Sequence, residues 1–285
     1  MTTPTPTPAA FTPLTQPLRD LGAWVAYFRQ AEIPVLGNTV DALEAMRANE
    51  DDVDANLIGE MVADDPLMTL KVLAYAAAHR PPRLVTDVET VTAAVVLMGI
   101  SPFFAAFGLQ PAIEDRLATE PEAQQGLNEV MKRAHRAAHF ALAFAIHRMD
   151  HDAAVIYEAA LLHDFAEMLL WCHAPSLALQ LRAAQKADPT LRSRAAQVSL
   201  LNVDLAALQQ ALMKSWSLPE LLIRITDDRH AEHPSVQSVI LAIRLARHTA
   251  DSWDNAAIPD DIVDLSQLLN LSLAATMRFV RELDG

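Results

Sequence analysis

Apolar residues recur along most of the chain at intervals of three and four positions, which places them on one face of a helix. A first stripe covers residues 21–28. Asp65 before Pro66 is typical of a helix start, and the spacing of Thr86 and Glu89 predicts a capped helix over 88–98. No Asn-Gly or Asp-Gly pair lies between alternating apolar runs, so strands are not indicated and we expect an all-α fold. Further helical patterns cover residues 127–147, 157–173, 175–187, 190–216, 219–229, 235–252 and 259–283.

Residues 91–113 carry no charged side chain, and such a stretch is long enough to span a bilayer. Gly99, Ser101 and Pro102 interrupt it, and Pro102 lies where a second helix would begin. We therefore expect two buried helices that meet near residue 100, and no membrane span.

The organisation of the chain follows from its composition. Residues 1–17 are rich in Thr and Pro and offer little apolar surface, so we expect a disordered tail. We expect a single helical domain over 18–285 with an N-terminal lobe over about 18–113 and a C-terminal lobe over about 127–285. The polar stretch 114–126 would separate the two lobes.

Charge and cysteine content limit the class of protein. The formal net charge of −14 disfavours nucleic acid as a partner, because such a surface repels phosphate backbones. The single cysteine, Cys172, excludes an internal disulfide and a CxxC motif, which favours a reducing cytoplasm, and its apolar surroundings predict a buried side chain. No basic region precedes an apolar one near the N-terminus, so we expect no export signal.

The pair His163-Asp164 is the strongest sign of chemistry in the sequence. It lies inside an apolar helical pattern over 157–171, so both side chains cannot face solvent while the apolar residues face the core. Burying such a group is costly without a partner. The residues that meet this pair therefore decide between a metal enzyme and a protein that has lost the metal site.

The sequence resembles the HDOD family, whose members are bacterial signalling modules related to the HD metal-dependent phosphohydrolases. The resemblance covers about residues 31–252 and implies a two-lobed helical fold related to the HD phosphohydrolase core. Ser101-Pro102-Phe103-Phe104 departs from it, since the family usually has basic residues there. The resemblance rests on the segments Ile33-Pro34-Val35-Leu36, 58–73, 88–100, the HD segment 161–170 and the Trp-x-Leu-Pro turn Trp216-Ser217-Leu218-Pro219.

The resemblance implies that an active site of this kind holds a divalent cation with an early His, the His-Asp pair and a late Asp. His135 or His139 could supply the early ligand, because the two lie four positions apart on one helix face. Arg247 stands where the resemblance places the late Asp, and its positive charge would repel a metal ion.

One further histidine expected before Trp216 is missing, and only His230 and His233 resemble the tail of the His-His-x-Pro element. We therefore expect a vestigial site with no catalytic residue, no bound metal and no cofactor. Its members would be His163, Asp164, His135, His139 and His230.

These features favour a non-catalytic signal-transduction module that binds a protein partner, with residues 91–113 as part of the docking surface. The alternative is a metal-dependent phosphohydrolase or cyclic-dinucleotide phosphodiesterase, in which the basic cluster Lys132, Arg133 and Arg136 would contact phosphate. The same cluster could instead be a solvated helix face. A third hypothesis is binding of a nucleotide second messenger without turnover.

Overall fold

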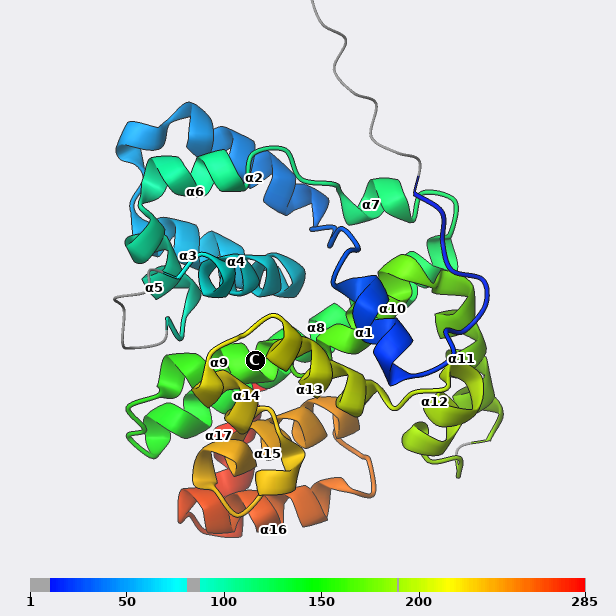
Figure 1. Ribbon diagram of the computed structural model, residues 1–285. Helices are drawn as coiled ribbons and strands as arrows, with labels where there is room; N and C mark the ends of the chain where they lie inside the picture. Colours follow the sequence, from blue (N-terminus) through cyan, green and yellow to red (C-terminus); the bar gives the residue numbers. More distant parts are fainter. Residues whose placement is uncertain (1–10, 81–87, 189, 285) are drawn as a thin grey trace, which may run out of the picture.

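The computed structural model describes residues 11–80, 88–188 and 190–284 (Figure 1). Within these residues the only β-structure is an isolated bridge between Val35 and Ala112, so the all-α prediction is confirmed. The helices are α1 (Leu21–Phe28), α2 (Gly37–Ala48), η1 (Glu50–Asp52), α3 (Ala55–Ala63), α4 (Pro66–Ala78), α5 (Val91–Met98), α6 (Ile100–Ala106), α7 (Ile113–Arg116), α8 (Pro121–His147), α9 (Ala153–Leu161), α10 (Phe165–His173), α11 (Pro175–Ala187), α12 (Ser193–Leu201), α13 (Leu205–Ser215), α14 (Glu220–Ile225), η2 (Asp228–His230), α15 (Pro234–His248), α16 (Ile258–Leu269) and α17 (Leu273–Asp284).

Helix α8 is the central element of the fold. It packs against α9, α10, α11, α15 and α17 along a buried stripe that includes Leu127, Ala134, Phe140 and Phe144. It begins at Pro121, earlier than predicted, because proline at the first helical position needs no hydrogen-bond acceptor. In Figure 1, α3–α6 lie on one side of α8, and α15–α17 lie on the other. The polar stretch 114–126 thus contains most of α7 and the first six residues of α8.

The start of the described chain packs against the C-terminal half. The Leu14 N–H donates to the His173 carbonyl at 2.8 Å, and the Phe11 ring meets the His173 ring edge-on. The expectation of a disordered tail is therefore wrong for residues 11–17, because Phe11 and Leu14 supply apolar contacts that the Thr/Pro composition concealed; residues 1–10 lie outside the described residues. Helix α1 packs on α13, and the Trp24 indole donates to the Leu201 carbonyl at 2.9 Å.

The uncharged segment forms two helices, as predicted. Gly99 separates α5 from α6 with a φ of 83°, a backbone conformation that glycine adopts without strain. The predicted cap at Thr86 lies outside the described residues; α5 begins instead after Thr90, whose side chain accepts the Ala93 N–H at 3.2 Å. No helix in the described ranges is long and apolar enough to cross a membrane.

Three of the long helical patterns are each divided into two helices. Asn202 and Asn270 take left-handed conformations that end α12 and α16, so the predictions of single helices over 190–216 and 259–283 are wrong. Asparagine tolerates this conformation better than most residues, and here it ends each helix at its C-terminus. The pattern over 157–173 is divided at His163-Asp164, between α9 and α10. The pair therefore lies in a helix break and not within a helix.

Candidate functional site

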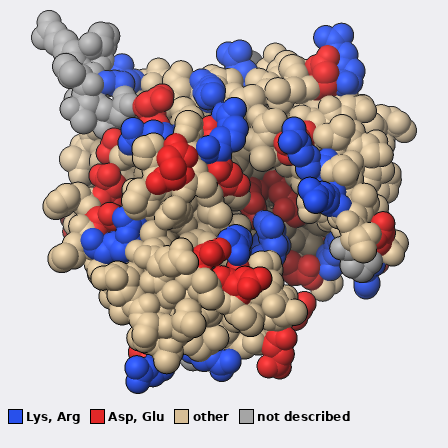
Figure 2. Space-filling view, turned by 90° about the horizontal axis from the view of Figure 1, so that it is seen from below, with Lys and Arg blue, Asp and Glu red and all other residues tan. Residues whose placement is uncertain are grey.

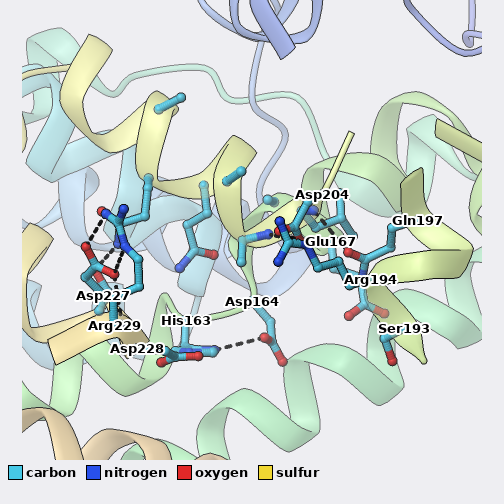
Figure 3. A pocket seen from close by; sticks show the side chains of 18 of the residues that line it. His163, Asp164, Glu167, Ser193, Arg194, Gln197, Asp204, Asp227, Asp228 and Arg229 are labelled. Carbon is cyan, nitrogen blue, oxygen red and sulfur yellow. Dashed lines mark hydrogen bonds and ion pairs between the residues drawn. The ribbon is translucent and has the colours of Figure 1, made fainter. Parts of the chain in front are cut away.

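His163 and Asp164 lie on the wall of a cavity of about 950 Å³ (Figure 3). Helix α10 begins immediately after Asp164, yet the Asp164 carboxylate makes no capping bond to the helix. It bonds instead to the side chains of the adjacent His163 and of Arg133 on α8. The rest of the wall comes mainly from α8, α10, α11, α12, α13, η2 and α15, and includes Arg133, Glu167, Asp204, Gln209, Gln210, Lys214, Asp228 and Arg247.

The His163 imidazole lies between two carboxylates. Its Nδ1 is 3.0 Å from Asp164 Oδ1, and its Nε2 is 3.1 Å from Asp228 Oδ1. Burial alone would lower the pKa of His163, but the hydrogen bonds to the two carboxylates overcome burial and raise this pKa to about 10. The ring is therefore an imidazolium that donates from both nitrogens at neutral pH. An imidazolium has no lone pair with which to bind a metal ion.

A guanidinium group bridges two acidic side chains that line the cavity, Asp164 just before α10 and Glu167 in its first turn. Arg133 Nη2 lies 3.3 Å from Asp164 Oδ2 and 3.3 Å from Glu167 Oε2. Although burial opposes ionisation, the hydrogen bond from His163 and the charges of His163, Arg133 and Arg247 hold the pKa of Asp164 below its usual range. Burial raises the pKa of Glu167, and the neighbouring charge of Asp164 adds to this effect. Asp164 is thus a fully ionised carboxylate that is already neutralised by cations of the protein.

The residues present do not fit the divalent cation that the HD resemblance implies. The Asp164 carboxylate forms an ion pair with Arg133, and the His163 ring is protonated. Among the described residues, no group of three or more His, Cys, Asp or Glu side chains is arranged to hold a metal ion.

The two candidates for the early histidine lie elsewhere. Burial lowers the pKa of His135, while the charge of Asp64 at the end of α3 acts against this effect, so the ring faces the N-terminal helices. His139 is exposed, with its ring centroid 6.1 Å from that of Tyr157. Successive helical residues are rotated by 100°, so the face of α8 that turns Arg133 toward Asp164 turns both histidines away. The expectation that His135 or His139 meets His163 is therefore wrong.

His230 also lies outside the cavity wall. Its ring is exposed and lies 3.9 Å from an Asp227 oxygen and 3.4 Å from a Glu232 oxygen. The residue of this segment that reaches His163 is Asp228, which the sequence interpretation missed. The acidic pair Asp227-Asp228 was the available signal, but only the fold shows which carboxylate faces the histidine.

The three members of the basic cluster have different surroundings. Lys132 is exposed, and Arg136 forms an ion pair with Asp284 of α17. Arg133 alone of the three lines the cavity. The prediction of phosphate contacts by Lys132 and Arg136 is not supported, because neither side chain reaches this wall.

The comparison with known proteins agrees with the fold. The HDOD domain model matches residues 33–232, and the chain belongs to the HDOD family. No curated protein matches the chain. The MmoQ response regulator of Methylococcus capsulatus str. Bath has a similar structure, with a TM-score of 0.67 and 18% identity over 88% of this chain and 98% of that one. A virulence factor of Campylobacter jejuni is similar with a TM-score of 0.59 and 16% identity, over 92% and 99% of the two chains. At these identities the likeness concerns the fold alone.

Proposed function

We propose that this protein is a non-catalytic signal-transduction module in which the former metal site has become an internal ion-pair network. The observation that carries this proposal is the position of Arg133, which bonds both Asp164 and Glu167. A guanidinium supplies fixed positive charge where a hydrolase of this class needs a divalent cation. It has no coordination position at which water could be activated.

A metal ion would bind here only if its binding free energy exceeded the free energy needed to disrupt this network. At pH 7, removing the proton from a histidine with a pKa of about 10 costs roughly 4 kcal/mol before any ligand bond forms. Displacing Arg133 would then leave its guanidinium without its carboxylate partners in a largely buried position, which costs a further amount of about 3 kcal/mol. Together these costs oppose occupation of the site by a metal ion at cellular concentrations.

The signalling role is supported by membership of the HDOD family and by the fold shared with a protein named as a response regulator. A bacterial, cytoplasmic protein partner is the kind of partner that this role requires. Val96 and Leu109, which are 68% and 81% exposed, lie in the uncharged segment 91–113 and offer apolar contact area for such a partner. The division into lobes over 18–113 and 127–285 belongs to the same proposal, although the packing of α1 on α13 favours a first lobe that begins after α1.

A metal-dependent phosphohydrolase is the second candidate function. The observation in its favour is that His163 and Asp164 are adjacent on the wall of a cavity large enough for a substrate. A nucleotide second messenger bound without turnover is compatible with the same cavity.

Hydrolysis assays separate these functions. Purified protein is incubated with Mn²⁺, Fe²⁺ or Ni²⁺ and with bis(p-nitrophenyl) phosphate or a cyclic dinucleotide, beside a variant carrying both His163→Ala and Asp164→Ala. We expect no turnover above the rate of the double variant with any of these metals. Metal-dependent turnover that the double variant loses would show that the protein is an enzyme.

A further inference from the structure

The acidic groups of the His163 cavity are already neutralised by cations that line the same cavity. In addition to the network around Asp164, Arg194 lies 3.3 Å from Asp204, and Arg229 lies 2.6 Å from Asp227. Asp228 is paired with His163. No carboxylate on this wall is therefore left to attract a positively charged ligand.

Two cations on the wall have no directly bonded acidic partner among the described residues. Lys214 in the last turn of α13 and Arg247 in the last turn of α15 both line the cavity and are both exposed. No ion pair or hydrogen bond joins either side chain to another described residue, and Arg247 acts on Asp164 and Glu167 only through its charge, without direct contact. Lys214 and Arg247 are thus available to pair with an anionic ligand in the cavity, although the chain as a whole has a formal net charge of −14. Figure 2 shows one face of the molecule with a hollow in which Asp and Glu side chains lie deep and Lys and Arg side chains lie along the edge.

Two buried polar atoms of residues in the cavity wall also lack partners. Arg133 Nε and Gln210 Oε1 are buried, and neither has a hydrogen-bond partner among the described residues. Gln209, which is 4% exposed, lines the same wall. A buried polar atom without a hydrogen bond destabilises the protein, so a ligand that supplies the missing bonds is stabilised by them.

We infer that this cavity binds a small organic anion without turnover. Its carboxylate or phosphate group would be bound by Lys214 and Arg247, and its hydrogen-bonding body would lie against Gln209 and Gln210. The cavity volume of about 950 Å³ suits a molecule of this kind. The inference rests on the proposed function, since a pocket that held a metal ion would bind anions through the metal.

Calorimetry on protein freed of metal by chelating resin tests this inference. The probes are inorganic phosphate, glucose 6-phosphate and glucuronate, with uncharged glucose as the matched neutral compound. Lys214→Met and Arg247→Met each remove one cation and keep an unbranched chain of similar length. Lys186→Met on α11, which is exposed and outside the cavity wall, is the matched control.

We expect at least one anionic probe to bind more tightly than glucose. Each cavity substitution should weaken that binding about tenfold, as the loss of one charge-assisted hydrogen bond predicts, and Lys186→Met should leave it unchanged. If glucose 6-phosphate binds and glucuronate does not, the cavity prefers a phosphate group. If the two bind equally tightly, the cavity recognises anionic charge in general.

The inference is overturned if no anionic probe binds, if glucose binds equally well, or if the cavity substitutions change affinity no more than Lys186→Met does. If the anion-binding experiment fails in this way and the protein also shows no metal-dependent turnover, only the inference about anion binding is rejected, and the proposed function stands. Metal-dependent turnover would instead contradict the proposed function itself.

Discussion

Glu158 is an ionisable group in the core, and its burial predicts a strong dependence of stability on pH. The side chain lies on α9, is 7% exposed, and accepts the Val91 N–H at the start of α5 through Oε1 at 2.8 Å. Its Oε2 is buried and has no hydrogen-bond partner among the described residues. Burial raises the pKa of Glu158 to about 8, although the bond from Val91 acts in the opposite direction.

The sign follows from proton linkage. An acid whose pKa is higher in the folded protein binds its proton more tightly there, so its contribution to stability is present below pH 4.5 and is lost as pH rises toward 8. Between pH 5 and pH 8 this group alone lowers the free energy of unfolding by about 1.4 kcal/mol per pH unit. The full loss above pH 8 is roughly 4–5 kcal/mol, which is a large share of the stability of a typical domain.

Glu158→Gln removes the titration while keeping the shape and the acceptor for Val91. The variant and the wild type should differ little in stability at pH 5, and the variant should be more stable by roughly 3 kcal/mol at pH 7.5. Urea denaturation followed by circular dichroism at several pH values between 5 and 8.5 measures this difference.

Glu60→Gln is the matched control, because the Glu60 carboxylate is exposed on α3. Its pH profile should remain parallel to that of the wild type. A Glu158→Gln profile that is also parallel to the wild type would refute the argument that a buried, protonated carboxyl joins α9 to α5.

Other substitutions test the packing around the site. Arg133→Met leaves two carboxylates without their cation and should lower the free energy of unfolding by about 3 kcal/mol in chemical denaturation at pH 7; an unchanged midpoint would contradict the ion-pair network. Gly126→Ala places a Cβ within 2.5 Å of the Trp171 ring and should cost about 1–3 kcal/mol, whereas Gly22→Ala, with its nearest contact at 3.4 Å, should be neutral or stabilising in the same assay. Trp24→Phe removes the indole hydrogen bond to α12 and should cost about 1–2 kcal/mol by urea denaturation, with a native far-UV spectrum; no loss would show that this bond does not join α1 to the C-terminal helices.

The periodicity of apolar residues was enough to predict the helical class, because each helix buries one stripe against a common core. The position of the division near residue 100 could also be predicted, since Gly99 and Pro102 act through local backbone geometry. The ends of α12 and α16 were missed because Asn202 and Asn270 adopt left-handed conformations, which the helical spacing of apolar residues does not reveal.

The candidate site was predicted only in part. His163 and Asp164 were recognised from the sequence, and Arg247, which the sequence singled out as a cation, lines the same cavity. The roles of Arg133, Asp228 and Glu167 depend on how far α8, η2 and α10 are rotated toward one another. That rotation is fixed by packing between segments distant in sequence, and no spacing along the chain reports it.

The protonation state of the His163 ring tests the central claim most directly. Nitrogen-15 spectra of the imidazole rings, recorded at pH 8 with excess Zn²⁺ and assigned with His163→Gln, report whether each ring nitrogen carries a proton. An ordinary histidine is neutral at this pH, whereas a pKa of about 10 predicts that both nitrogens of His163 remain protonated and unaffected by zinc. A neutral ring with one nitrogen bound to zinc would contradict the account.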